Sequence, residues 1–211
     1  MSIGIIGAGN VGQALARNLV AQGERVVFGV PDAAKYASAV VQLGPNARVD
    51  TVEQAVLASD LLILAVPYGA AQQVAESVPD WGGRILVDAT NPLAPGLAGL
   101  ALGTTTSGAE EIARHARGAR VVKAFNTTGA ENMVQPRYPG GAVFMPVAGD
   151  DAEARARVVA LATRLGFEAV DVGPLSAARY LEPFAMTWIH MAIKRGLGRD
   201  FAFGLLKRSA G

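Results

Sequence analysis

The sequence predicts an α/β fold in which a mainly parallel sheet is covered by helices on both faces. Short runs rich in valine, isoleucine and leucine alternate along the chain with alanine-rich helical segments. Several of these runs, such as "LLILAV" and "RILVDA", are apolar almost without interruption, which is typical of central strands buried on both faces. A glycine-rich turn follows the first run and leads directly into a helical pattern.

The individual elements follow from these patterns. Strands are expected at residues 3–6, 25–28, 61–66, 84–88, 120–125, 143–148 and 168–172, with a weaker one near 48–49. Helices are expected between them, at residues 11–22, 33–43, 52–58, 70–77, 108–116 and 151–165. The uncharged stretch at 89–109 has about the length of a membrane span. Its prolines, glycines and threonine run predict a surface loop instead.

Beyond Gly173 the pattern becomes helical, with Pro183 either kinking one helix or opening a second segment. We therefore expect a dinucleotide-binding domain over residues 1–173 and a C-terminal helical segment over 174–211. This segment is expected to pack on the sheet domain or on a partner subunit.

Composition narrows the classes of function. The chain has 211 residues, of which 51% are hydrophobic and 18% charged, so it predicts a globular protein. A net charge of +1 gives no support for a nucleic-acid or anionic-membrane partner. The absence of cysteine excludes disulfides and thiolate metal sites and suits a cytoplasmic location. The first residues lack the basic region of a signal peptide, so a soluble protein is expected.

The glycine turn predicts a dinucleotide site. Gly7, Gly9 and Gly12 match the G-x-G-x-x-G pattern of a Rossmann fold, in which they allow a tight turn, close approach of pyrophosphate and close helix–strand packing. The N-terminus of the following helix would present its free N–H groups to the phosphates. The candidate pyrophosphate-binding residues are Gly7, Ala8, Gly9, Asn10, Val11 and Gly12.

The end of the second strand bears on which dinucleotide is bound. Asp32 follows Gly12 by twenty residues, the position at which an acid usually meets the ribose 2′-hydroxyl of NAD. It comes after Val30 and a proline, so it could also lie past the strand end and point away. Lys35 is the nearby cation that could meet the 2′-phosphate of NADP. These residues leave NAD and NADP both open.

Three further strand ends carry polar or rigid residues at the edge where a nicotinamide would lie. Asparagines there could hydrogen-bond a carboxamide or a substrate carbonyl, or they could serve as local turn or cap residues. The candidates are Val66, Pro67 and Tyr68, then Asn91 and Pro92, then Lys123, Phe125 and Asn126.

Acid–base groups are scarce in this sequence. His115 lies on a charged helix face and is expected to be a solvated surface residue, while His190 lies among apolar neighbours and is expected to be packed. Neither has metal-ligand partners at useful spacing, so no metal site is expected. Lys123 could stabilise a hydride acceptor electrostatically or pair with a nearby carboxylate. Hydride transfer between two organic cofactors needs positioning more than it needs an acid or base, which fits this scarcity.

The chain resembles the coenzyme F420-dependent NADP oxidoreductase family, which includes the related cytoplasmic domains of the STEAP ferric reductases. The resemblance rests on "GAGNVGQALA" at 7–16, "AVPY" at 65–68, "VVKAFNTTGAENM" at 121–133, "VDVGPLSAARYLEP" at 170–183 and "GRDFAFGLLKR" at 198–208. It implies a Rossmann domain with a small C-terminal helical part, usually dimeric. It also implies transfer of a hydride between nicotinamide C4 and the C5 of a deazaflavin.

By the same resemblance, residues 7–12 would hold the pyrophosphate and Val66 and Pro67 would flank the cofactor. Asn91 with Pro92, and Phe125 with Asn126, would line the place where the two rings meet. Family members often have arginine after the second strand, where this chain has Val-Pro-Asp at 30–32.

Three functions are compatible with the sequence. The first is an oxidoreductase that transfers a hydride between NADP or NAD and coenzyme F420 or a flavin. The second is an NAD(P)-dependent reductase of a small carbonyl or imine compound, in which Tyr68, Lys123 or His190 supplies or orients the proton. The third is a non-catalytic NAD(P)-binding redox sensor. Partners are expected to be small molecules and a second copy of the chain.

Overall fold

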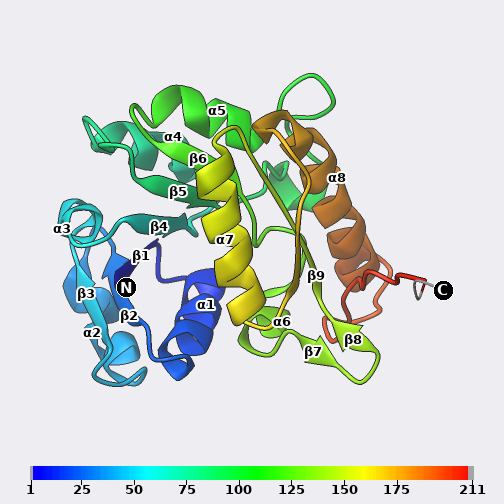
Figure 1. Ribbon diagram of the computed structural model, residues 1–211, viewed down its shortest axis with the longest axis horizontal. Helices are drawn as coiled ribbons and strands as arrows, with labels where there is room; N and C mark the ends of the chain where they lie inside the picture. The colour runs from blue at the N-terminus through cyan, green and yellow to red at the C-terminus, as the bar shows by residue number, and fades with distance from the viewer. Residues whose placement is uncertain (1, 209–211) are drawn as a thin grey trace.

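The computed structural model describes residues 2–208 and contains a sheet of eight strands in the order β10-β9-β6-β5-β4-β1-β2-β3 (Figure 1). The strands β3, β2, β1, β4, β5 and β6 lie side by side in this sequence and are mutually parallel. This is the 3-2-1-4-5-6 order of a doubly wound fold. Strand β9 pairs antiparallel with β6, and β10 pairs parallel with β9. The predicted α/β fold with a mainly parallel sheet is therefore confirmed.

The strands that make up this sheet are short. They are β1 (Ser2–Ile6), β2 (Arg25–Gly29), β3 (Ala47–Asp50), β4 (Leu61–Leu64), β5 (Ile85–Asp88), β6 (Arg120–Lys123), β9 (Phe144–Gly149) and β10 (Glu168–Asp171). A separate hairpin is formed by β7 (Arg137–Tyr138) and β8 (Gly141–Ala142).

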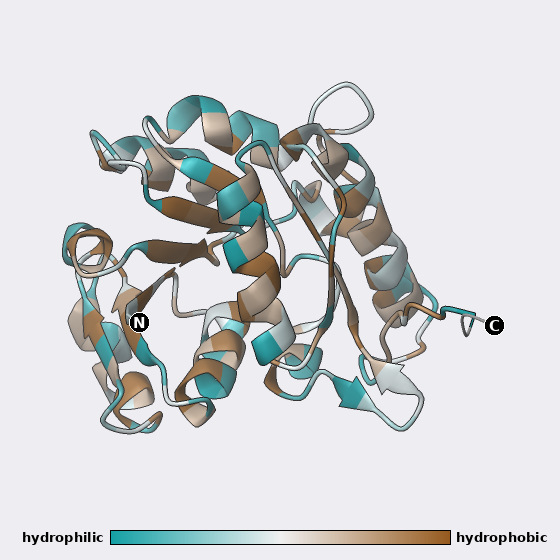
Figure 2. Ribbon diagram, in the orientation of Figure 1, coloured by the Kyte–Doolittle hydropathy of each residue, from teal (hydrophilic) through white to brown (hydrophobic). Residues whose placement is uncertain are grey.

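Helices cover both faces of the sheet and create two hydrophobic layers. One layer lies under α1, α6 and α7, of which α7 passes in front of the strands in Figure 1. The other lies under α3, α4 and α5. The apolar colour of Figure 2 concentrates on the central strands that both layers bury. The helices are α1 (Asn10–Ala21), α2 (Ala33–Val41), α3 (Val52–Leu57), α4 (Tyr68–Ser77), α5 (Gly108–His115), α6 (Ala130–Val134), α7 (Ala152–Arg164) and α8 (Ala178–Ile189). Within residues 2–208, no helix has the length and apolar character needed to cross a bilayer.

Two strands end earlier than the sequence pattern predicts. Strand β4 stops at Leu64 and β6 at Lys123, although apolar residues continue beyond both. After β6 the chain leaves the strand conformation because Phe125 adopts a left-handed backbone with φ of 59°. The short helix α6 and the β7–β8 hairpin were not predicted, since neither is long enough to show a periodic pattern.

The C-terminal part packs on the sheet domain of its own chain. Helix α8 runs unbroken through Pro183, so the alternative of two separate segments is wrong. After it, an extended tail returns to β9, where the Phe144 N–H donates to the Phe203 carbonyl at 2.9 Å. Phe203 also stacks on Phe184 of α8 with ring centroids 4.6 Å apart. Phe203 of the tail therefore forms part of an aromatic seam that joins α8 to the sheet.

A buried cluster of three charges joins the sheet to the C-terminal part. The Lys123 ammonium at the end of β6 lies 2.8 Å from Asp88 of β5 and 2.8 Å from Glu182 of α8, and no part of these side chains is more than 1% exposed. Lys123 also donates to the Thr90 carbonyl at 2.6 Å, so each of its three N–H groups has an acceptor. The Glu182 carboxylate accepts in addition the N–H groups of Gly108 and Ala109 at the start of α5.

These contacts keep Lys123 charged in spite of its burial. Burial by itself would lower the pKa of the ammonium, but the Asp88 and Glu182 carboxylates outweigh it and raise the pKa above the usual lysine value. A raised folded-state pKa stabilises the fold fully below the unfolded pKa of about 10.4, and this stabilisation is lost as pH rises through the folded pKa. The cluster is therefore intact at neutral pH.

Replacing Lys123 by methionine should destabilise the fold strongly, because two buried carboxylates would lose their cation. We expect Lys123→Met to lower the free energy of unfolding by about 3–5 kcal/mol, measured by urea denaturation. The control is Lys207→Met, which removes an ion pair with Glu168 whose lysine side chain is 67% exposed. The control should change stability by less than about 1 kcal/mol. Equal effects of the two variants would contradict the role given to the cluster.

Candidate functional site

The glycine turn after β1 has the geometry of a phosphate-binding turn. Gly7 has φ of 105°, and a Cβ there would lie 2.5 Å from the Ala65 carbonyl oxygen. A Cβ on Gly12 would collide with the Gly7 carbonyl oxygen, so Gly12 lets α1 pack tightly against the turn. A Cβ on Gly9, in contrast, would meet no atom within 4 Å. The open side of the turn is therefore at Gly9, where a ligand can approach the backbone.

The start of α1 is prepared for an anion. Gly9 is the N-cap residue and no side chain caps the helix, whereas α2, α3, α5 and α7 are each capped by a side chain. The first turn, which begins with Asn10 and Val11, contains no acidic residue. The N–H groups and the positive end of the helix dipole are thus available to a phosphate. These residues fit the pyrophosphate of a dinucleotide.

A cavity of about 520 Å³ lies next to this turn, at the carboxyl ends of β1 and β2. Ligands of doubly wound folds bind in this crevice. The structure brings together Val30, Val66 and Pro67, three of the predicted cofactor-binding residues, on its wall. It also places there a residue that the sequence analysis missed, Glu53 of α3. The size and mostly apolar walls fit an adenosine.

Asp32 and Lys35 are outside the wall of this cavity. The Asp32 carboxylate accepts the backbone N–H of Lys35 at 3.2 Å and caps α2. This agrees with the alternative from the sequence in which Asp32 lies past the end of the second strand and points away. The Lys35 ammonium lies over the ring of Tyr36, 5.4 Å from its centroid. Both side chains are exposed, and a contact of either with a ribose stays a prediction.

Two asparagines meet at the reactive edge of the sheet. The Asn91 side chain donates to the Asn126 carbonyl at 2.9 Å, and the Asn126 side chain donates to Asn91 Oδ1 at 3.0 Å and to the Leu181 carbonyl at 3.3 Å. The Oδ1 atom of Asn126 is buried and has no hydrogen-bond partner. A buried oxygen without a donor is costly unless a ligand supplies one. It fits the amide N–H of a nicotinamide carboxamide.

Two predicted site residues turn out to have structural roles. The Phe125 side chain is fully buried and packs edge-to-face on Phe167, with centroids 5.7 Å apart, so only its backbone belongs to the edge. Lys123 is enclosed by Asp88 and Glu182 and cannot touch a substrate. The alternative that the sequence left open for Lys123, pairing with a nearby carboxylate, is confirmed. A buried ion cluster needs partners from distant segments, which the local sequence does not show.

Tyr68 is a half-buried phenol at the start of α4. Burial raises its pKa to about 12, and the carboxylates of Glu182, Glu111 and Asp88 add to this effect. Its ring lies against Gly108, beside Pro92 at the end of β5. Tyr68 therefore stays protonated at neutral pH and can donate a hydrogen bond.

Neither histidine has the surroundings that the sequence suggested. His115 is partly buried, and its Nδ1 lies 2.8 Å from Glu76 of α4, so it is not simply a solvated residue. His190 is exposed rather than packed, and it lies directly after α8, where the chain continues as a π-helical turn over His190–Lys194. Among residues 2–208, no group of three His, Cys, Asp or Glu residues could hold a metal ion.

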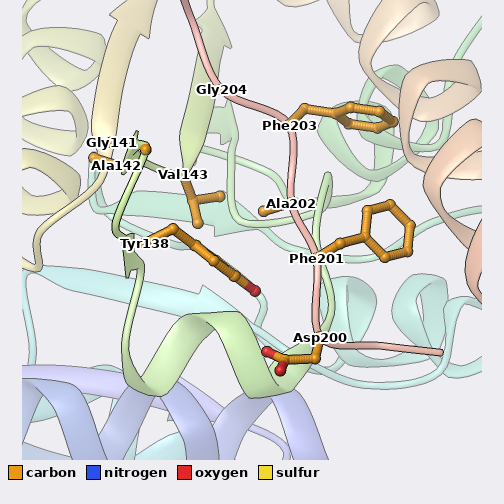
Figure 3. A pocket seen from close by; sticks show the side chains of 10 residues that line it. Tyr138, Gly141, Ala142, Val143, Asp200, Phe201, Ala202, Phe203 and Gly204 are labelled. Carbon is orange, nitrogen blue, oxygen red and sulfur yellow. The ribbon is translucent and has the colours of Figure 1, made fainter. Parts of the chain in front are cut away.

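A second cavity, of about 310 Å³, lies between the β7–β8 hairpin and the C-terminal tail (Figure 3). Tyr138 and Asp200 face each other across it, and the Tyr138 hydroxyl donates to Asn132 Oδ1 at 2.6 Å. Burial raises the pKa of Tyr138, and the Asp200 carboxylate raises it further. The rest of the wall is formed by Val143, Phe201, Phe203 and the glycines and alanines of both segments. This cavity was not predicted, since it forms between two segments about sixty residues apart in the chain.

Comparison with protein families identifies similar chains. Residues 2–92 match the family described as NADP oxidoreductase, coenzyme F420-dependent, a range that contains the glycine turn and the residues that line the cavity next to it. The metalloreductase STEAP3 of Rattus norvegicus is 31% identical over 180 residues, which are 85% of this chain and 35% of STEAP3. The chain thus spans about a third of the length of this curated relative.

Solved structures extend the similarity to the whole chain. A hypothetical protein of Sinorhizobium meliloti is 33% identical, with a TM-score of 0.79 over 87% of this chain and 90% of that one. A candidate F420-dependent NADP reductase of Arthrobacter sp. FB24 is 29% identical, with a TM-score of 0.83 over 97% and 99%. A reductive aminase of Aspergillus terreus in complex with NADPH4, cyclohexanone and allyl amine shares the fold at 23% identity, with a TM-score of 0.68 over 92% and 62%.

Gly9→Ala and Gly12→Ala separate ligand binding from folding at the turn. Gly9→Ala should fold with nearly unchanged Tm, because its Cβ meets no atom within 4 Å. It should weaken dinucleotide binding about tenfold or more, since the methyl group would occupy the path of the pyrophosphate. Gly12→Ala should lower Tm by several degrees, because its Cβ meets backbone. Calorimetry and fluorescence titration measure the two effects, and undiminished binding by Gly9→Ala would contradict a pyrophosphate at this turn.

Proposed function

We propose that this chain transfers a hydride between a nicotinamide dinucleotide and a deazaflavin or flavin, as expected of the coenzyme F420-dependent NADP oxidoreductase family that its residues 2–92 match. The dinucleotide is NADP or NAD. The deazaflavin considered first is coenzyme F420, because the related Arthrobacter protein is described as a candidate F420-dependent NADP reductase.

The observation that carries this proposal is the chemistry of the reactive edge. The strand ends that would surround the nicotinamide offer amide groups, from Asn91 and Asn126, and no free carboxylate or ammonium. The charged residues nearest to these asparagines are Asp88, Lys123 and Glu182, which form ion pairs with one another in the buried cluster. Such an edge can bind and orient two rings, and positioning is the main requirement of hydride transfer between cofactors.

Different residues of the chain would bind the pyrophosphate, the adenosine and the nicotinamide of the dinucleotide. The turn at 7–12 and the start of α1 hold the pyrophosphate, and the cavity with Val30, Val66 and Pro67 takes the adenosine. Asn126 Oδ1 accepts the carboxamide N–H of the nicotinamide and so fixes the plane of the ring. With both molecules bound, the nicotinamide would supply a hydride with its two electrons from C4 to C5 of the deazaflavin, and a proton from solvent would complete the reduction.

A second candidate is reduction of a small imine or carbonyl compound, which also needs a proton donor. The observation in its favour is the position of Tyr68, a half-buried phenol that directly follows Val66 and Pro67 of the cavity wall. Several imine reductases share the fold of this chain at low identity, which supports the architecture but not the substrate. A non-catalytic dinucleotide sensor is the third function, and it is an outcome of the experiment below.

Two further expectations, a homodimer and a cytoplasmic location, stay predictions. The division of the chain at residue 173 also stays a prediction, because the C-terminal part shares the buried cluster and an aromatic seam with the sheet.

The function can be tested by mixing the protein with NADPH or NADH and with coenzyme F420 or FMN. We expect the absorbance of oxidised F420 to fall with multiple turnovers, and FMN to be reduced more slowly or not at all. Tight dinucleotide binding without turnover of either acceptor would contradict the proposal. In that case the same assay with cyclic imines distinguishes a small-molecule reductase from a sensor.

Tyr68→Phe distinguishes the two catalytic functions. If a small imine or carbonyl takes its proton from Tyr68, removal of the hydroxyl should lower kcat about a hundredfold or more. Hydride transfer to a deazaflavin does not pass through the phenol, so its kcat should change less than about threefold. A hundredfold loss of F420 reduction would show that Tyr68 takes part in the reaction that we propose.

A further inference from the structure

The wall of the adenosine cavity carries an acid at the place where coenzymes are discriminated. In doubly wound folds the ribose of the adenosine lies beyond the end of β2, and an acid there binds its 2′-hydroxyl, whereas an arginine accepts a 2′-phosphate. Among the described residues that line this cavity, the one acid is Glu53, from the first turn of α3. No lysine or arginine occurs among the described residues that line the cavity.

The backbone explains how Glu53 reaches this position. Strand β3 pairs with β2 so that Gly29, the last residue of β2, lies beside Asp50, the last residue of β3. Helix α3 therefore starts next to the end of β2 (Figure 1). A Cβ on Gly29 would come within 3.0 Å of Val52 Cα and Ala55 Cβ, so the glycine is what lets α3 pack this closely.

The other groups nearby do not favour a phosphate. The Asp32 carboxylate occupies the N-terminus of α2 and places a negative charge there. Pro31, which also lines the cavity, has no N–H to donate. The Thr51 hydroxyl accepts the Gln54 N–H as the cap of α3. Lys35, which could have met a phosphate, lies over Tyr36.

We propose that Glu53, rather than Asp32, binds the ribose hydroxyls of the adenosine and makes this protein prefer NAD(H) to NADP(H). The Glu53 carboxylate accepts hydrogen bonds from the 2′- and 3′-hydroxyls of NAD, and it repels the 2′-phosphate of NADP. The inference rests on dinucleotide binding at the glycine turn, which is part of the proposed function, but it does not depend on the electron acceptor.

The test is a titration of the protein with NADH and with NADPH, followed by the fluorescence of the reduced nicotinamide. Wild-type protein should bind NADH at least tenfold more tightly than NADPH. Glu53→Gln removes the charge and should move the ratio of the two Kd values at least tenfold toward NADPH, and Glu53→Arg should move it further. The matched control is Asp32→Asn, which also removes one carboxylate and keeps a capping side chain. It should move the ratio less than about threefold.

Each outcome has a definite meaning. Tighter binding of NADPH by wild-type protein overturns the inference, and so does an unchanged ratio in Glu53→Gln. A larger shift in Asp32→Asn than in Glu53→Gln would assign the ribose contact to Asp32 and overturn the role of Glu53. A preference for NADH together with no reduction of F420 or FMN would support the inference and contradict only the proposed acceptor, since the titration requires no acceptor.

Discussion

Lys123 carries a positive charge that has no contact with solvent, and it keeps that charge because two carboxylates face it. Asp88 belongs to the neighbouring strand and Glu182 to the C-terminal helix, so the ammonium joins segments that are far apart in the chain. Glu182 extends the connection by accepting the first N–H groups of α5. An isolated charge at this depth would be strongly unfavourable, so the four segments can only be buried together.

The cluster also determines the chemistry of the reactive edge. The cluster lies at the ends of β5 and β6. The charges there, on Asp88 and Lys123, pair with each other in the interior and are not exposed to a ligand. The next residues along the chain, Asn91 and Asn126, then meet above it, and Leu181, the neighbour of Glu182, supplies a carbonyl to Asn126. The edge that results presents amide groups, and it includes a buried amide oxygen that lacks a donor. This suits the positioning of planar rings better than acid–base catalysis.

At the glycine turn, the structure requires backbone segments to approach one another closely. Gly7 and Gly12 allow the turn to fold onto β4 and α1, while Gly9 leaves its outer side free. Gly29, at the end of the neighbouring strand β2, likewise allows close packing. It lets α3 approach, and α3 places Glu53 at the cavity. The shape of the glycine turn and the position of Glu53 thus both depend on the absence of a side chain at a strand end, since a Cβ would push the next element away.

The sequence by itself determined the α/β fold, the parallel strands, the glycine turn and the strand ends that form the site. These features are local, because hydrophobic periodicity and glycine spacing reflect the backbone conformation of consecutive residues. The tertiary structure decided the roles of individual side chains. Lys123 became a buried cation, Phe125 turned into the core and Asp32 became a helix cap, while Glu53 came to the cavity from the neighbouring strand end. Which residues face a ligand depends on how strands and helices from distant parts of the chain pack together, and no local pattern contains that information.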